Sequence, residues 1–356
     1  MTVVQTNVVE VKKPDFYATE QVGGEIAFKE VFVQGEVGKV TRRVNRHPDC
    51  IASNPDYVPD EKTLRRALAW WHTPMRMAFG LHGETGTGKT ELLLYIADRL
   101  NEPVYMVKVH PALMPEDLEG CKQLVNGDNG VVTKNSLGPA AKAYALGGLI
   151  ILDEVDKSNA ALGCALHGLV EGKPWPVEQF SMTINRHPMC RVTGTANTTG
   201  QGGHERYHTS GRMDLALRSR FGWMQTHFPT PAREMAILEK KFGQMLPRAM
   251  LKACVDVANG FRDAVLGAAD QHGKRPGLDN PEINAVFSTR TLVNWCNYTI
   301  AYGPTATWQE SFDFAFDGSL DPECKREADA ITQRILGGKL DMNVKDVVES
   351  YKPVKP

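Results

Sequence analysis

The sequence predicts an α/β fold, in which a central parallel five-stranded sheet flanked by helices is followed by a smaller all-helical domain. Between Tyr57 and Phe228, short apolar runs alternate with segments of helical periodicity, which is typical of a parallel sheet covered on both faces. A glycine-rich loop at Gly83–Thr90 follows the first of these runs. After Pro229 and Pro231 only helical periodicity remains, which predicts the second domain.

Each expected strand is a run of apolar or β-branched residues. The runs predict strands at residues 77–81, 104–109, 149–152, 191–197 and 222–228. Apolar residues at helical spacing predict a helix at 90–100 within the first domain. In the second domain the same spacing predicts helices at 232–242, 248–269, 291–300 and 324–336.

Composition excludes several classes of protein. The 356 residues include 41 Lys and Arg against 42 Asp and Glu, a net charge of −1 that gives no general attraction to nucleic acid or anionic membrane, although a neutral total can hide a local basic patch. Seven cysteines occur singly, which favours a reducing, cytoplasmic setting over a disulfide scaffold. The N-terminus shows no signal-peptide pattern, and no apolar run approaches the ~18 residues of a membrane span.

Residues 83–90, GETGTGKT, match the phosphate-binding pattern G-x-x-x-x-G-K-[ST] at every fixed position. Its glycines let backbone N–H groups curl toward phosphate oxygens, Lys89 adds positive charge, and Thr90 offers a hydroxyl to Mg²⁺. The alternative is a glycine-rich turn with a surface lysine, which the flanking strand and helix disfavour. The motif predicts ATP and Mg²⁺ as cofactors, bound through Gly83, Glu84, Thr85, Gly86, Thr87, Gly88, Lys89 and Thr90.

Residues 149–154, LIILDE, indicate a buried strand that ends in two acids. Asp153 is placed to hold Mg²⁺ through water, and Glu154 is placed to polarise the attacking water. Phosphoryl transfer needs mainly positioning and charge neutralisation, so these two carboxylates suffice. Alone, the motif is equally compatible with a strand followed by a solvated helix cap.

The succession GETGTGKT, LIILDEVD, GTAN, ALRSRF and STRTLVNW resembles AAA+ ATPases. Within them the chain is similar to the MoxR group, above all to the ATPase subunit of aerobic cobaltochelatase, CobS, from about Phe28 to about Leu336. The change of pattern along the chain predicts an N-terminal extension at 1–57, an α/β domain at 58–228, and a helical domain with a C-terminal tail at 229–356. The resemblance identifies the second of these as the nucleotide-binding domain and the third as its lid. The acids that continue as Glu154-Val-Asp156 depart from the chelatase pattern.

The resemblance also implies roles for four further residues. Asn197 matches sensor 1, which orients the attacking water. Arg220 matches the arginine finger, which reaches a neighbouring subunit's nucleotide, and Arg218 is close enough to share or take that role. Arg290 matches sensor 2, which reaches from the lid to the γ-phosphate. Because a finger acts only between abutting subunits, we expect a homo-oligomeric ring, a hexamer. A turn-capping Asn and solvated arginines are the alternatives.

Two segments resemble inserted hairpins of MoxR-type proteins, which face the ring pore or a partner. They lie at residues 118–134 and 173–188, and exposed loops are the alternative. Residues 204–208 spell the zinc-protease pattern H-E-x-x-H, but they follow a glycine-rich run instead of lying within a helix. We therefore expect no zinc site there.

Three functions agree with these motifs. The first is remodelling of a partner protein, such as a von Willebrand factor A-domain protein or a chelatase subunit, with cobalt insertion as one case. The second is a nucleic-acid motor or a phage or defence-system ATPase on the same scaffold, which the neutral charge disfavours. The third is a nucleotide-binding scaffold without hydrolysis, which the intact Lys89, Asp153 and Glu154 oppose.

Overall fold

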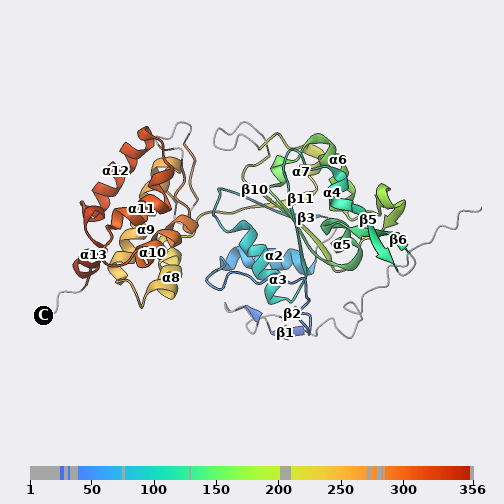
Figure 1. Ribbon diagram of the computed structural model, residues 1–356, viewed down its shortest axis with the longest axis horizontal. Helices are drawn as coiled ribbons and strands as arrows, with labels where there is room; N and C mark the ends of the chain where they lie inside the picture. The colour runs from blue at the N-terminus through green and yellow to red at the C-terminus, as the bar shows by residue number, and fades with distance from the viewer. Residues whose placement is uncertain are drawn as a thin grey trace, which may run out of the picture.

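The computed structural model describes two parts of different composition. Figure 1 shows an α/β part on the right and an all-helical part on the left, as the sequence predicts. The residues that the structure describes are 25–27, 31–32, 39–73, 77–127, 130–200, 210–270, 274–278, 283 and 285–352. The H-E-x-x-H segment at 204–208 lies outside them.

The central sheet has five parallel strands in the order β11-β3-β10-β7-β4. The strands are β3 (Ala78–His82), β4 (Val104–Lys108), β7 (Gly148–Asp153), β10 (Cys190–Ala196) and β11 (Phe221–Gln225). Each begins within one residue of its predicted start. All of β10 is buried, and so is β7 up to its last residue, because helices cover both faces of the sheet.

The two faces of the sheet are covered by different helices. One face carries α2 (Glu61–His72) and α3 (Lys89–Arg99), and the other carries α4 (Pro115–Glu119), α5 (Pro139–Leu146) and α6 (Ala160–Glu171). Residues of β7 alternate between the two cores: Leu149 and Ile151 pack under α2 and α3, and Ile150 and Leu152 pack on the opposite side. This alternation explains why β7 is an uninterrupted apolar run in the sequence.

The described residues before α2 pack against the α/β part. A short antiparallel pair, β1 (Glu25–Ala27) and β2 (Lys39–Thr41), precedes a segment that runs along α3. Arg43 forms a buried ion pair with Glu102, at 2.7 Å between Nη2 and Oε2. Val40 is buried in the core cluster beneath α2 and α3.

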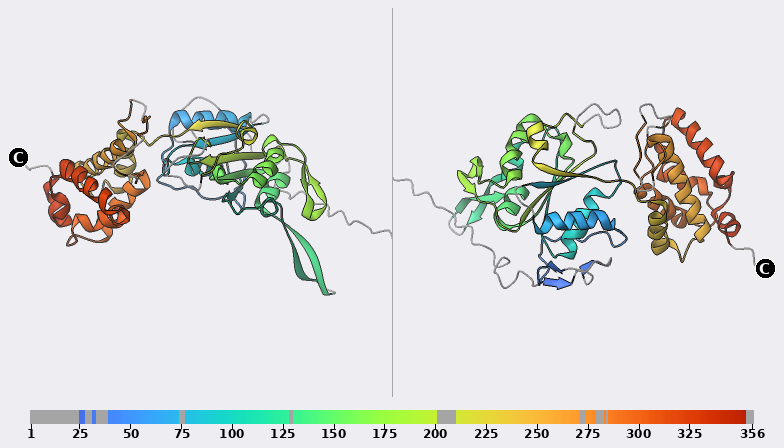
Figure 2. Two further views of the ribbon diagram at one scale, coloured as in Figure 1. Left: turned by 90° about the horizontal axis from the view of Figure 1, so that it is seen from above. Right: turned by 180° about the vertical axis from the view of Figure 1, so that it is seen from behind.

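Both predicted hairpins are present. The longer consists of β5 (Gly120–Gly127) and β6 (Gly130–Leu137), and the shorter of β8 (Trp175–Val177) and β9 (Met182–Ile184). Figure 2 shows the longer hairpin extending from the body of the α/β part. Near its tip, Leu124 is 76% exposed and Val131 is 66% exposed. These apolar side chains therefore contribute little to the protein's own core.

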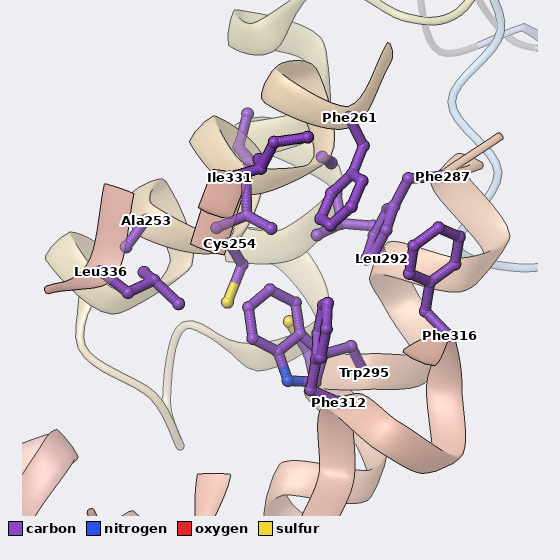
Figure 3. Packing of buried hydrophobic residues seen from close by; sticks show 14 of the residues in the cluster. Ala253, Cys254, Phe261, Phe287, Leu292, Trp295, Phe312, Phe316, Ile331 and Leu336 are labelled. Carbon is purple, nitrogen blue, oxygen red and sulfur yellow. The ribbon is translucent and has the colours of Figure 1, made fainter. Parts of the chain in front are cut away.

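The helical part surrounds an aromatic core. Its helices are α8 (Pro231–Phe242), α9 (Arg248–Leu266), α10 (Thr289–Ala301), α11 (Trp308–Ala315), α12 (Pro322–Leu336) and α13 (Val344–Ser350). Figure 3 shows the rings at the centre, which include Phe261, Phe287, Trp295, Phe312 and Phe316. The four predicted helices are confirmed and begin within two residues of the predicted positions. Among the described helices, none is both long and apolar enough to cross a membrane.

Replacing residues 122–135 with a short turn is expected to leave the fold intact. The described side chains of this stretch are all exposed, so their removal uncovers little apolar surface. The measurement is the midpoint of thermal unfolding, which we expect to change by less than about 3 °C. A large drop would show that the hairpin stabilises the α/β part.

Candidate functional site

The loop between β3 and α3 is shaped by glycines that no other residue could replace. Gly83, Gly86 and Gly88 have φ angles of +149°, +81° and +85°, a region that favours glycine. A Cβ atom on Gly86 would lie 2.4 Å from Cβ of Ser288, and one on Gly83 would lie 2.4 Å from the carbonyl oxygen of Thr226. The loop at residues 83–88 thus forms a cradle, in which Gly83 and Gly86 have no room for a side chain.

Lys89, the first residue of α3, points back into this cradle. Its ammonium donates to the carbonyl oxygens of Gly83 at 2.7 Å and Glu84 at 3.0 Å, and to Oδ1 of Asn197 at 3.1 Å. Lys89 is only 8% exposed. Burial lowers its pKa to about 8, although nearby carboxylates, Asp156 foremost, oppose the shift. A buried cation at the N-terminus of a helix suits a polyanionic ligand.

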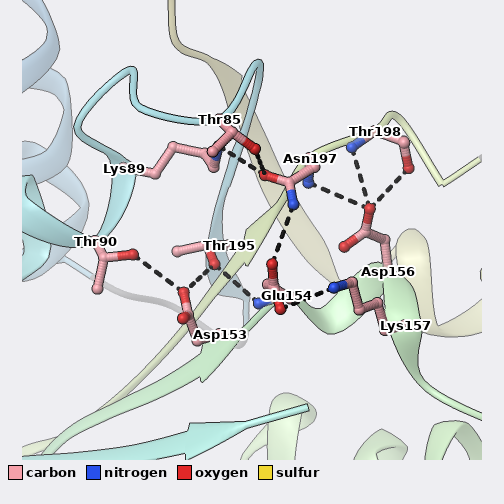
Figure 4. A network of polar contacts seen from close by, with 10 residues as sticks. All are labelled: Thr85, Lys89, Thr90, Asp153, Glu154, Asp156, Lys157, Thr195, Asn197 and Thr198. Carbon is pink, nitrogen blue, oxygen red and sulfur yellow. Dashed lines mark hydrogen bonds and ion pairs between the residues drawn. The ribbon is translucent and has the colours of Figure 1, made fainter. Parts of the chain in front are cut away.

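Thr90 and Asp153 meet at the carboxyl end of β7. Thr90 Oγ1 donates to Asp153 Oδ1 at 3.0 Å, and the same carboxylate oxygen accepts from Thr195 Oγ1 at 2.6 Å (Figure 4). Thr195 Oγ1 also accepts from the backbone N–H of Glu154 at 3.0 Å. One hydroxyl on β10 therefore holds both acids of the LIILDE motif in place.

Glu154 adopts a left-handed backbone conformation, with φ of +60°, which is uncommon for a residue with a side chain. Its carboxylate accepts from Nδ2 of Asn197 at 3.2 Å through Oε1, and from Nζ of Lys157 at 3.0 Å through Oε2. Such backbone strain is found where surrounding contacts fix a functional group. The two donors hold the carboxylate beside Lys89's partner, Asn197, as Figure 4 shows.

Asp156 anchors the segment that carries Asn197. Its Oδ2 accepts from the backbone N–H groups of Asn197 at 3.2 Å and Thr198 at 3.1 Å, and from Thr198 Oγ1 at 2.9 Å. Asp156 is 1% exposed, so these bonds offset the cost of burying its charge. Sequence reasoning gave no role to Asp156, Thr195 or Lys157. Two features of the sequence could have pointed to them. Asp156 is a third acid after LIILDE, and Thr195 is a polar residue within an otherwise apolar strand.

The structure keeps Arg218 and Arg220 apart from this cluster. Arg218 is the last residue of α7 (Leu215–Arg218), and Arg220 lies two residues later, just before β11. Arg220 Nε forms an ion pair with Glu171 Oε1 at 2.6 Å, and Arg220 Nη1 donates to the carbonyl oxygen of Ala216 at 2.5 Å. Within the described residues, neither arginine forms a hydrogen bond or ion pair with Lys89 or Glu154.

Arg290 lies at a cleft between the α/β part and the helical part. The cleft has a volume of about 390 Å³, and its lining includes Tyr57, Gly86, Thr87, Gly88, Thr226, Arg290 and Val293. Two ion pairs join the walls of the cleft, Arg233 to Asp60 at 3.0 Å and Lys241 to Asp56 at 2.7 Å. The structure thus brings Arg290 to the same cleft as the glycine loop.

These residues fit a nucleotide with Mg²⁺. Gly83 and Gly86 leave no room for a side chain, so the loop presents backbone there, and backbone N–H groups are the usual ligands of phosphate oxygens at a helix N-terminus. The hydroxyl of Thr90 and the carboxylate of Asp153 are hard oxygen donors of the kind that Mg²⁺ prefers. They already lie within hydrogen-bonding distance of one another.

Known proteins match most of the chain. A family model described as an AAA domain (dynein-related subfamily) matches residues 79–221. Protein NorQ of Paracoccus denitrificans is 30% identical over 242 residues, which make up 67% of this chain and 78% of NorQ. The chain belongs to the MoxR-type AAA+ ATPases.

Further relatives confirm the resemblance seen in the motifs. Aerobic cobaltochelatase subunit CobS of Sinorhizobium sp is 27% identical over 261 residues, 71% of this chain and 74% of CobS. Denitrification regulatory protein NirQ of Pseudomonas aeruginosa is 37% identical over 214 residues, 60% of this chain and 72% of NirQ. A solved structure, the Thermotoga maritima RuvB Holliday junction branch migration motor, aligns with a TM-score of 0.43 and 16% identity, covering 75% of this chain and 72% of RuvB.

ATP affinity is expected to fall as pH rises above about 8. In the free protein Lys89 has a pKa of about 8, whereas a bound phosphate favours its charged form. Above that pH, binding must take up a proton, so affinity declines by up to about tenfold per pH unit. Titration with a fluorescent ATP analogue measures this. Lys89→Arg, which stays charged, should flatten the decline, and a wild-type affinity that does not change with pH would contradict the assignment.

Thr195→Val should impair both stability and hydrolysis. It leaves the N–H of Glu154 without its acceptor and frees Asp153, so the free energy of unfolding should fall by about 1–3 kcal/mol. The matched control is Thr193→Val on the same strand, where the hydroxyl donates only to the carbonyl oxygen of Ile150. Phosphate release per folded chain should drop in the first variant alone. An equal loss per folded chain in both variants would contradict a specific role for Thr195.

Proposed function

We propose that this chain is a Mg²⁺-dependent ATPase that works as a hexameric ring and uses ATP hydrolysis to remodel a partner protein. Its membership of the AAA+ ATPases supports the hydrolysis. The observation that carries the proposal is the hydrogen-bonded cluster of Lys89, Thr90, Asp153, Glu154 and Asn197 at one edge of the sheet.

Each residue of the cluster has a proposed task. The N–H groups of residues 83–90 and the ammonium of Lys89 bind the β- and γ-phosphates, and Thr90 and Asp153 hold Mg²⁺. Mg²⁺ supplies neutralisation of the charge on the phosphate oxygens. Glu154 polarises the attacking water, and Asn197 orients that water while its amide fixes the carboxylate. Arg290, from the lid, contacts the γ-phosphate as sensor 2.

Arg220 is the proposed arginine finger. Within its own chain it pairs with Glu171 and does not contact Glu154, which supports a role at the nucleotide of a neighbouring subunit. Arg218 is the alternative. A residue that acts on the next subunit requires a head-to-tail contact, and such contacts form a ring where the rotation between subunits closes.

The remodelled partner is proposed to be a protein, such as a von Willebrand factor A-domain protein or a chelatase subunit. One relative is named a cobaltochelatase subunit, so metal insertion is one form that the work can take. The exposed apolar side chains of Leu124 and Val131, near the tip of the β5–β6 hairpin, support contact with a protein surface.

Two inactive variants are expected to complement each other. Arg220→Ala should lower turnover roughly a thousandfold with ATP binding kept, and Glu154→Gln should bind ATP but hydrolyse it slowly. Mixed rings contain interfaces where an intact Arg220 faces an intact Glu154, so hydrolysis should return. Arg218→Ala distinguishes the two candidate arginines: it should retain turnover if Arg220 is the finger, and a loss equal to that of Arg220→Ala would assign the role to Arg218. No recovery in rings shown by native mass spectrometry to be mixed would contradict a finger acting between subunits.

Glu154→Gln is also the variant with which to find the partner. Capture from source cells in the presence of ATP, followed by mass spectrometry, should yield a six-fold ring with a von Willebrand factor A-type or chelatase protein. The control is the same variant without residues 122–135, which should form rings but lose the partner. Recovery of nucleic acid, or of replication, packaging or defence proteins, would instead favour a nucleic-acid motor or defence ATPase and leave the ATP chemistry standing.

A further inference from the structure

A fully buried ion pair lies inside the lid. The side chains of Glu234 on α8 and Arg262 on α9 are both 0% exposed, and two parallel hydrogen bonds of 2.8 Å join the guanidinium to the carboxylate. The third donor of Arg262, Nε, reaches the carbonyl oxygen of Phe287 at 2.7 Å. The guanidinium also lies 4.4 Å from the centre of the Phe228 ring, in the segment that leads from the sheet into the lid.

The ion pair fixes the chain on both sides of Ser288. On one side, Arg262 holds the carbonyl of Phe287, whose ring stacks on Phe261 with 5.5 Å between centroids. On the other side, Thr289 Oγ1 donates to Oε1 of Glu234 at 2.7 Å. The position of Ser288 along the start of α10 is therefore set by directional bonds to the buried pair.

Ser288 is where the lid touches the phosphate loop. The space that a Cβ on Gly86 would need is taken by Cβ and Oγ of Ser288, at 2.4 and 2.9 Å. Ser288 Oγ also accepts from the N–H of Thr291 at 3.1 Å and so caps α10. Arg290 lies in the first turn of that helix and lines the cleft. A shift of residues 287–289 would move both the serine and the arginine.

Stability alone gives little reason for such a pair. A buried ion pair can often be replaced by apolar residues of similar volume without loss, because desolvation offsets the attraction between the charges. The ion pair also forms directional hydrogen bonds with the carbonyl of Phe287 and the hydroxyl of Thr289. These bonds fix the position of residues 287–289 more narrowly than apolar packing would.

We propose that Glu234, Arg262 and Thr289 are positioning residues that seat Ser288 against the phosphate loop and aim Arg290 into the cleft, and so set the affinity for ATP. This inference rests on the proposed ATP site. Glu234 and Arg262 are fully buried, do not line the cleft, and act through Ser288 and Arg290. Thr289 also lines the cleft, so the double variant of Glu234 and Arg262 tests the positioning role apart from any direct contact.

Thr289→Val tests the network without breaking the ion pair. The full chain is titrated with a fluorescent ATP analogue and Mg²⁺, and its unfolding midpoint is measured alongside. Loss of one hydrogen bond to a charged group should weaken binding about tenfold. Thr332→Val is the matched control, because this buried lid hydroxyl bonds only to its own helix backbone, at Ala328 and Asp329. Thr289→Ser keeps the hydroxyl and should bind as the wild type does.

The double variant Glu234→Leu with Arg262→Met separates positioning from folding. It removes both charges at similar volume, so the lid should stay folded while ATP affinity falls at least as far as in Thr289→Val. Affinity in Thr289→Val equal to that of Thr332→Val would overturn the proposal, as would a double variant that stays folded and binds normally. If the wild-type chain bound no ATP, the proposed function would fail and the positioning role with it.

Discussion

The parallel register of β3, β10 and β7 is the constraint from which the site follows. Ala196 pairs with His82, and Gly194 pairs with Leu152, so the three strands end at one edge of the sheet. The phosphate loop, Asn197 and the two acids each begin one or two residues later. The buried hydroxyl of Thr195 then ties this edge together by bonding both acids. Helices on both faces make the edge rigid.

Burying charge at this edge has a physical consequence. Burial removes water from the Lys89 ammonium and lowers its pKa to about 8. The nearby carboxylates therefore offset only part of the cost of burying this positive charge. The helical lid contacts the α/β part across the cleft through two ion pairs, Arg233 with Asp60 and Lys241 with Asp56, and through Ser288. A polyanion bound in the cleft would therefore contact the loop, the sheet edge and the lid together.

Much of the fold and of the site could be predicted because it is local in sequence. The apolar runs of β7 and β10 and the GETGTGKT loop carry their own patterns, and the strand ends place Asp153 and Asn197. The helix α2 was not predicted, although Leu64, Ala67, Leu68 and Trp71 are buried at helical spacing. Long-range pairs, such as Glu234 with Arg262, leave no local signal, because a charged residue in an amphipathic helix normally indicates a solvated face.

The most direct test of the account is phosphate release from ATP by the wild-type chain and by Asp153→Asn, each measured across a range of Mg²⁺ concentrations. If Thr90 and Asp153 hold Mg²⁺, turnover in the wild type requires Mg²⁺. In the variant the account predicts a loss of about a hundredfold or more at equal ATP occupancy, because the carboxylate that Thr90 and Thr195 orient is gone. Equal turnover in the two proteins, or wild-type turnover that persists in a chelator, would contradict it.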